Sequence, residues 1–159
     1  MALELTTNWK FVSDAVMGGV SLGTIRSVTI AGREATHLTG DVSLENNGGF
    51  VQMAFDVNDD CSDFDASGFK GIEIEVFGNE ESYDLRLRTS DLARPWQSFR
   101  ASFLAPSSWT TVRIPFDEFM PHKTEVLFNP RCLRRIGILG IGREFSAYVA
   151  VSKIRLINS

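Results

Sequence analysis

Arginine and tryptophan side chains that could bind a ligand follow an alternating pattern between residues 83 and 103. Successive side chains of a strand point to opposite faces, so polar residues that alternate with apolar ones share one face. The ring of Trp96 could stack on a flat ligand, and guanidinium groups could supply planar hydrogen-bond donors. The pattern predicts one outer face that carries Glu73, Glu75, Asp84, Arg86, Arg88, Trp96 and Arg100, with Arg86, Arg88, Trp96 and Arg100 as candidate binding residues.

A charged sheet surface is the alternative interpretation of the same residues. If the intervening turns are tight, the expected neighbours are Glu75 with Arg86, Glu73 with Arg88, Asp84 with Arg100, and Arg88 with Trp96. Cross-strand ion pairs of this kind contribute about 0.2–1 kcal/mol each and need no ligand. Both interpretations stay open, since the tryptophan beside arginines is the one feature that favours a ligand.

Two glycine-rich segments, Val12–Ser21 and Gly40–Phe50, form a second candidate site. Each contains two adjacent glycines, which permit positive φ angles and a close approach by another backbone or a ligand. Asn46 and Asn47 precede the second glycine pair and tolerate left-handed geometry. Two tight turns between strands would also explain the glycines, so a structural corner and a binding surface both stay open.

Residues for catalysis, metal binding or nucleotide binding lack the spacing that known sites require. His37 and His122 have no Cys or His at zinc-ligand spacing and no neighbouring G-x-S-x-G nucleophile. Gly137–Gly142 has the spacing G-x-x-G-x-G, and no helix is expected after it, unlike a dinucleotide site. Asp56–Asp65 could hold Ca²⁺, although it lacks the glycine and glutamate of an EF-hand. The sequence thus predicts no enzyme, no catalytic residue and no cofactor, and it assigns no metal ligand while a cation in this loop stays open.

Composition is that of an ordinary folded protein and disfavours several classes of function. The 159 residues are 43% hydrophobic and 23% charged, which suits one domain over residues 1–159 with a substantial core. The net charge of −4 disfavours nonspecific nucleic-acid binding, and no apolar run is long enough to cross a bilayer. The N-terminus resembles neither a signal peptide nor a transit peptide, so we expect a cytoplasmic protein. Cys61 and Cys132 are then expected to be reduced thiols, although one disulfide stays open.

Short-range alternation, interrupted by Gly, Pro, Asn and Asp, indicates an all-β fold. About nine strands without a repeat or a linker predict a two-sheet sandwich. The short connections at residues 78–82 and 90–96 predict neighbouring antiparallel strands, and Pro115–Pro121 is expected to be a loop or one helical turn. The expected strands are Thr24–Ile30, Ala35–Leu44, Phe50–Val57, Gly71–Phe77, Tyr83–Thr89, Gln97–Phe103, Thr110–Ile114, Arg135–Ile141 and Phe145–Ile157.

The glycine-rich segments carry a resemblance to a known family. Trp9-x-x-Val12-Ser-Asp-x-Val-Met-Gly-Gly-Val-Ser21 and Gly40-x-Val-Ser-Leu-Glu-Asn-Asn-Gly-Gly-Phe50 resemble the complex I intermediate-associated protein 30 (CIA30) family. Tyr83-x-Leu-Arg-Leu-Arg-Thr89 and Trp109-x-x-Val-Arg-Ile-Pro-Phe116 are similar to it as well, and the resemblance extends from about Asn8 to Leu156. The resemblance implies a galactose-binding-like jelly roll, in agreement with the sandwich predicted from alternation.

The resemblance also implies a role in assembly and a set of motif residues. Eukaryotic members act as non-enzymatic factors in the assembly of respiratory complex I, whereas this sequence has no import extension and resembles a free-standing bacterial protein. Asp14 and Asn46 could cap backbone donors in each other's segment, which would hold the two segments side by side, and Met17 suits an exposed contact. Phe50 is expected to fill the core under its turn. The binding residues expected from the motifs are Asp14, Met17, Gly18, Gly19, Asn46 and Asn47.

Two functions follow as hypotheses from these sites. The first is a non-enzymatic binding or assembly module that recognises a protein partner, such as a respiratory-complex subunit or an assembly intermediate. The second is a carbohydrate-binding module of the jelly-roll type, because aromatic faces and planar donors suit sugar rings. An enzyme is the third possibility, and no residue pattern in the sequence requires it.

Overall fold

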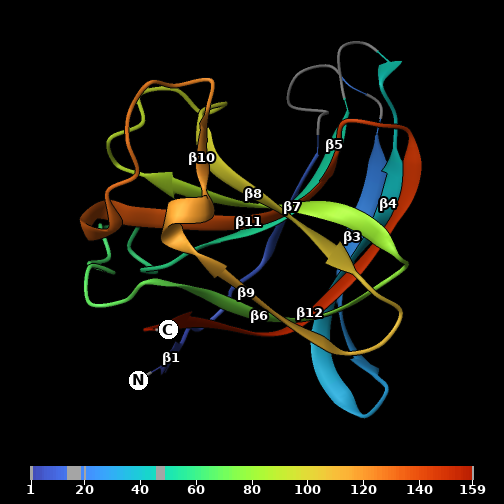
Figure 1. The fold of residues 1–159 in the computed structure, drawn as a ribbon. Coiled ribbons are helices and arrows are strands. Elements are labelled where there is room, and N and C mark those ends of the chain that lie inside the picture. The colour runs from blue at the N-terminus through green and yellow to red at the C-terminus, as the bar shows by residue number, and fades with distance from the viewer. Residues whose placement is uncertain (1, 14–18, 20, 46–48, 159) are drawn as a thin grey trace.

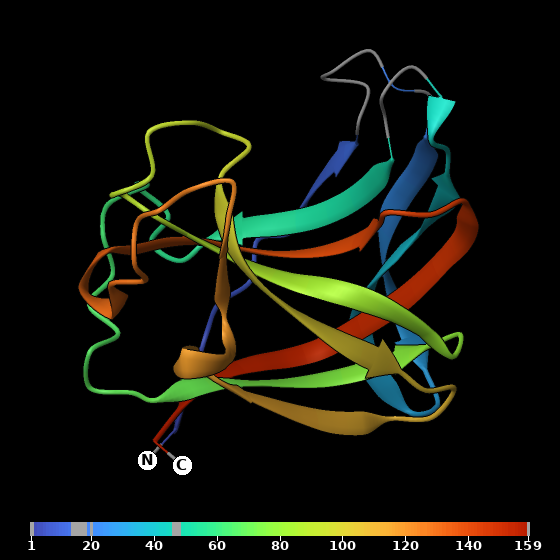
Figure 2. The ribbon, with the colours of Figure 1, turned by 45° about the horizontal axis from the view of Figure 1, so that its top comes forward.

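The apolar faces that the alternation predicts are buried between two antiparallel sheets (Figures 1 and 2). The computed structural model describes residues 2–13, 19, 21–45 and 49–158. The first sheet has the strand order β3 (Leu22–Ile30), β4 (Arg33–Val42), β12 (Phe145–Ile157), β6 (Gly71–Gly78) and β9 (Thr110–Pro115), and β1 (Ala2–Glu4) also pairs with β12. The second sheet has the order β10 (Met120–His122), β8 (Ser98–Ala105), β7 (Glu81–Thr89), β11 (Leu133–Ile141), β5 (Phe50–Asp56) and β2 (Lys10–Ser13).

The predicted all-β sandwich is confirmed, with twelve strands within the described ranges in place of about nine. Each of the nine predicted segments forms a strand whose ends differ by a few residues at most from the prediction. The additional strands β1, β2 and β10 have three or four residues each, which is too short for alternation to reveal them. Phe116–Glu118 forms the expected single helical turn, a 3₁₀ turn, and the chain then enters β10 directly.

The chain crosses from the first sheet to the second between β6 and β7, where the sequence predicts neighbouring strands. β6 pairs with β12 and β9, whereas β7 pairs with β8 and β11. The predicted pairs of Glu75 with Arg86 and Glu73 with Arg88 are therefore wrong, and these acidic and basic residues lie on opposite outer faces. The reason is that both strands bury their apolar faces against each other across the core, which places them in facing sheets.

The outer face of the first sheet balances its charges within itself. Glu73 accepts hydrogen bonds from Nε of Arg113 at 2.9 Å and from Nη1 of Arg155 at 2.8 Å. Glu75 accepts from Nη1 of Arg33 at 2.7 Å and lies 3.4 Å from Nη1 of Arg155. Hydrogen bonds from Arg113 first, and then from Arg155, lower the pKa of Glu73. Arg33, Arg113 and Arg155 are thus committed to carboxylates.

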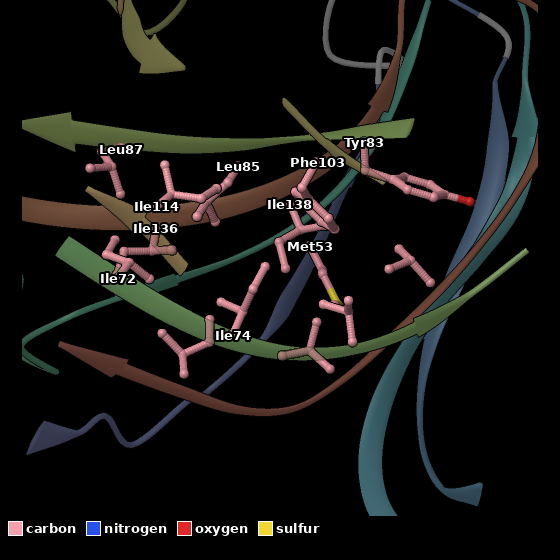
Figure 3. Close-up of a cluster of buried hydrophobic side chains, with 14 of the residues drawn as sticks. Met53, Ile72, Ile74, Tyr83, Leu85, Leu87, Phe103, Ile114, Ile136 and Ile138 are labelled. Carbon is pink, nitrogen blue, oxygen red and sulfur yellow. The ribbon is translucent and has the colours of Figure 1, made fainter. Parts of the chain in front are cut away.

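Branched aliphatic and aromatic side chains from both sheets fill the space between them (Figure 3). Ile72 of β6 and Leu85 of β7 are fully buried, as the alternation predicts. The hydroxyl of Tyr83 accepts a hydrogen bond from the backbone N–H of Tyr148 at 2.9 Å and donates one to Oδ1 of Asn79 at 2.6 Å. Burial raises the pKa of Tyr83 to about 12. This hydroxyl therefore ties the crossing between β6 and β7 to β12.

Two glycines lie directly opposite each other in the β3–β4 pair, next to the glycine-rich segments. Gly23 and Gly40 are register partners. A Cβ atom at Gly40 would overlap the backbone carbonyl oxygen of Leu22, and one at Gly23 would crowd that of Thr39. The ring of Phe11 also packs close to Gly23. Glycine at these two positions therefore permits the close approach of β3 and β4 at the end where both strands meet the glycine-rich segments.

Gly40→Ala should destabilise the fold because the added methyl group meets backbone atoms that no side-chain rotation can move. We expect the free energy of unfolding to fall by about 1–3 kcal/mol, measured by urea denaturation. Gly68→Ala is the matched control, since Gly68 has open space around its Cβ position and no positive φ. Equal unfolding midpoints for the two variants would contradict the close approach described for Gly40.

Candidate binding groove

A groove with a volume of about 1230 Å³ lies on the outer face of the second sheet. It runs from β10 and β8 at one end of the sheet to β5 and β2 at the other. A smaller hollow of about 490 Å³ over β3, β4 and β12 is lined mainly by short hydroxyl and apolar side chains. The groove is lined by Val12, Leu44, Gly49, Phe50, Gln52, Arg86, Arg88, Pro95, Trp96, Gln97, Ser98, His122, Lys123, Arg135, Gly137, Leu139, Ile141 and Gly142.

Gly137 lies at the middle of the groove floor. Its register partners are Arg86 on β7 and Ala54 on β5. A Cβ atom at Gly137 would overlap Nε2 of Gln52, so glycine leaves room for the Gln52 side chain to lie over the centre of the sheet. The floor is therefore low at its centre and presents an amide group there.

An ion pair on β7 orients one arginine of the groove. Arg86 donates to Oδ2 of Asp84 from Nε at 3.1 Å and from Nη2 at 2.8 Å. Ser102 of β8 donates to the other oxygen of Asp84 at 3.2 Å. Asp84 is buried, so these bonds satisfy a carboxylate that would otherwise be costly to remove from water. The guanidinium of Arg86 is thus fixed, and its charge is balanced.

Among the described residues Arg88 has only neutral partners, and it supports the loop that carries Trp96. Its Nη1 donates to the backbone carbonyls of Arg94 and Pro95 at 3.0 Å each, and to that of Gln97. Burial lowers the pKa of Arg88, and neighbouring arginines lower it further. Trp96 itself remains 59% exposed at the groove rim. A half-buried cation therefore holds the loop that carries an exposed ring.

The side chain of Gln97 joins two loops at this end of the groove. Its Oε1 accepts from the backbone N–H groups of Ala93 and Arg94 at 3.0 Å each, and its Nε2 donates to the carbonyl of Lys123 at 3.2 Å. Residues 90–97 (yellow-green) and the segment after β10 (orange) accordingly lie side by side in both ribbon views (Figures 1 and 2). The wall of the groove is thus built from two connections that are distant in sequence.

Sequence reasoning identified part of this site. Arg86, Arg88 and Trp96 all line the groove, and whether they bind a ligand stays a prediction. Arg100 lies opposite Arg86 on the same face and is exposed, but it is outside the groove lining. The register partner of Asp84 is Ser102, two residues along β8 from the Arg100 that the sequence predicts as its neighbour.

Several groove residues were not predicted because they come from distant strands. Arg135 is contributed by β11, which pairs with β7 and β5, and His122 by the short strand β10. Burial lowers the pKa of His122, and Arg86, Arg100 and Lys123 lower it further. No local pattern in the sequence indicates which strands are neighbours, so these residues carried no recognisable signal.

The described flanks of the two glycine-rich segments lie side by side at one end of the molecule (Figures 1 and 2). The Ser43 N–H donates to Oγ of Ser21 at 2.8 Å. Gly49 lines the groove, and its carbonyl accepts from the N–H of Gly142 at 3.1 Å. Phe50 was expected in the core but lines the groove, because β5 turns its neighbours Val51 and Met53 inward.

The motif residues themselves lie mostly beyond what the structure describes. Gly19 is half-buried, and its expected binding role stays a prediction. The remaining predicted motif residues, namely Asp14, Met17, Gly18, Asn46 and Asn47, lie outside the described residues.

The acidic loop Asp56–Asp65 uses its polar groups in local turns. Asp60 accepts from the hydroxyl and the N–H of Ser62, and Asp65 accepts from the N–H of Ser67. Among the described residues, no group of three or more His, Cys, Asp or Glu side chains could hold a metal ion. Both cysteines are free thiols, one exposed and one buried. The described part of the chain also contains no helix that is long and apolar enough to span a membrane.

Gln97→Ala should loosen the loop at the groove rim without unfolding the sandwich. The variant removes the acceptor of two backbone N–H groups, so we expect the amides of Ala93 and Arg94 to exchange with solvent at least about tenfold faster. Hydrogen exchange followed by NMR measures this directly. Arg100→Ala, an exposed substitution on the same sheet, should leave those rates unchanged. Unaltered exchange in Gln97→Ala would show that the loop is held by other contacts.

Solved structures of carbohydrate-binding modules share this jelly-roll fold. The family 11 module of the cellulosomal cellulase Lic26A-Cel5E of Clostridium thermocellum has a TM-score of 0.78 and 15% identity, and it covers 97% of this chain and 89% of that chain. A family 11 module from the same organism in complex with a β-1,3-1,4-mixed-linked tetrasaccharide has the same TM-score and identity, with 99% and 96% covered. The family 30 module of cellulosomal cellulase Cel9D-Cel44B, also from C. thermocellum, has a TM-score of 0.73 and 14% identity, with 100% and 98% covered. At these identities the likeness shows the fold alone.

The sequence itself points to a different family. A comparison with curated proteins finds no match. The family model described as complex I intermediate-associated protein 30 (CIA30) matches residues 2–148. The match includes both glycine-rich segments and every residue that lines the groove. The chain therefore belongs to the complex I intermediate-associated protein 30 family, as its motifs predict.

Proposed function

We propose that this chain is a non-catalytic binding module that holds an extended segment of a protein partner in the groove of the second sheet. The observation that carries the proposal is the position of its exposed apolar side chains. Of the seven large hydrophobic side chains that are exposed among the described residues, four belong to this face, namely Leu44, Trp96, Leu104 and Met120. Exposed apolar groups gathered on one face are typical of protein-interaction surfaces.

The size and shape of the groove favour a chain-like ligand. Its volume of about 1230 Å³ exceeds the range of about 300–1000 Å³ that is usual for small-molecule pockets. It crosses strands from both edges of the sheet, so an occupant would extend over the sheet surface. Family membership supports a protein occupant, because the family is named for its association with an intermediate of complex I.

The opposite face offers less to a partner. There Glu73 and Glu75 are hydrogen-bonded to arginines of the same sheet. A partner that bound this face would have to displace satisfied ion pairs, whereas the groove face presents an exposed ring, apolar groups and unpaired cations. This difference between the two faces supports the second sheet as the interaction surface.

A carbohydrate ligand is the second candidate, and two observations favour it. Trp96 presents an exposed ring at the groove rim, where a sugar ring could stack. The structural neighbours are carbohydrate-binding modules, and one of them is in complex with a mixed-linked tetrasaccharide. We rank this function second because the groove of this chain combines a single exposed large aromatic side chain with aliphatic residues and cations.

The combined substitution of Trp96→Ala and Met120→Ala should remove partner binding while leaving the fold intact. Both side chains are more than half exposed, at 59% and 62%, so the thermal midpoint should change little. Capture of partner proteins from an extract of the cells that make the protein, quantified by mass spectrometry, should fall at least about tenfold. Leu127→Ala is the control, since Leu127 is 79% exposed and lies neither in the groove lining nor on a strand of the second sheet, whereas Trp96 lines the groove and Met120 lies on the strand at its edge. Equal capture by both variants would overturn the assignment of this face.

Affinity electrophoresis on a mixed-linked β-glucan separates the two candidate functions. For a module that recognises protein, we expect the same mobility in gels with and without the polysaccharide. Retardation of the wild-type protein that disappears in Trp96→Ala would instead favour the carbohydrate function, because loss of one stacked ring removes about 0.5–1.5 kcal/mol of contact energy.

A further inference from the structure

The cations of this chain are distributed unequally between the two outer faces. On the first sheet Arg33, Arg113 and Arg155 are paired with glutamates. In the groove, Arg88, Lys123 and Arg135 form no ion pair with any described residue. Three cations without an ion pair among the described residues therefore lie in one groove of a chain whose net charge is −4.

Two carboxylates, Asp84 and Asp56, lie on the strands that carry these cations or pair with them. Asp84 is bonded to Arg86 and Ser102. Asp56, the register partner of Arg135, lies outside the groove lining and forms no ion pair within the described ranges. No Asp or Glu belongs to the groove lining where the structure describes it. The groove thus has positive charge that the described chain does not neutralise.

Two titrating groups in the groove respond to this positive charge. Burial lowers the pKa of His122, and the cations Arg86, Arg100 and Lys123 lower it further, against a smaller opposing effect of Asp84. Burial likewise lowers the pKa of Arg88, and the charges of Arg135 and Arg134 add to the effect. Groups at separate positions along the groove therefore experience the same sign of potential.

The other end of the groove is apolar. Its lining there comes from β2, β5, the end of β11 and the connections beside them, and its apolar side chains are Val12, Leu44, Phe50, Leu139 and Ile141, beside Gln52 and two glycines. Aliphatic side chains of a peptide pack well against such a surface, whereas the hydroxyl groups of a sugar would lose water without gaining hydrogen bonds. A cationic end and an apolar end therefore lie along one continuous groove.

We propose that the partner segment is an extended acidic peptide, with Asp or Glu side chains over the cationic end at β7, β8, β10 and Arg135, and with an aliphatic residue over the apolar end. Arginine recognises carboxylates through paired N–H donors, and charge complementarity sets the specificity of such contacts. This inference rests on the proposed function, because it names the chemistry of the ligand for the same groove.

Selection of random linear peptides displayed on phage against the immobilised full chain tests the inference. We expect the selected peptides to be enriched in Asp and Glu next to aliphatic residues. The dissociation constant of a selected peptide, measured by fluorescence anisotropy, should rise at least about tenfold in Arg135→Glu and in Lys123→Glu. It should also rise between about 50 mM and about 500 mM NaCl, because salt screens the charge pairs.

The controls separate a change of charge from a change of fold. Lys70→Glu makes the same change in net charge at an exposed residue outside the groove, and it should bind the peptide as the wild type does. Lys123 is exposed, so Lys123→Glu tests the charge even if the half-buried Arg135 does not tolerate glutamate. Circular dichroism melting curves verify the fold of each variant.

Three other results of the peptide selection would contradict the acidic ligand, the peptide-binding function or the protein nature of the ligand. Selected peptides that are neutral or basic, yet lose binding in the combined Trp96→Ala and Met120→Ala variant, would refute the acidic ligand and leave the peptide-binding function standing. An absence of peptides that depend on the groove would refute the proposed function itself. Binding of a soluble polyuronate in the groove, without any selected peptide, would assign the site to an anionic carbohydrate instead.

Discussion

The burial of two alternating apolar faces against each other is the constraint on which the rest of the structure depends. β6 and β7 follow one another with a two-residue connection, and each has an inward row of aliphatic side chains that includes Ile74 and Leu87. Had the strands formed a hairpin, both rows would share one sheet face. Because the chain crosses instead between the sheets, the rows meet across the core and the polar rows are separated onto opposite outer faces.

That separation determines the electrostatics of the molecule. Glutamates of β6 have arginine partners within the first sheet, so their negative charges are balanced there. The arginines of β7 lie in the other sheet, away from those glutamates. Within the described ranges Arg86 has a carboxylate partner, Asp84 two residues before it, and Arg88 has none. Arg88 is partly removed from water and donates to backbone carbonyls instead. These bonds satisfy its N–H donors but do not neutralise its positive charge. The positive potential of the groove is thus a consequence of the sheet topology.

The sequence reveals local features of this fold and leaves its non-local ones undetermined. Alternation correctly places Tyr83 and Leu85 in the core and Arg86 and Arg88 on the surface, because the direction of a side chain depends only on its own strand. Which strands are neighbours depends on the whole chain, so the predicted pair of Glu75 and Arg86 fails. Arg135 could not be predicted as a groove residue for the same reason. It lies beside Arg88 because β11 pairs with β7, and no local pattern indicates that pairing.

The glycine-rich segments can be connected to the groove through their described ends. The chain passes from β2 to β3 through the first segment and from β4 to β5 through the second, so both segments link the two sheets at the same edge. Gly49 of the second segment lines the groove and bonds to Gly142 in the connection between β11 and β12. A ligand at the apolar end would therefore lie against the segment that carries the family motif. The described end of the second segment, Gly49 and Phe50, and the groove are thus parts of one surface at the edge of the sandwich.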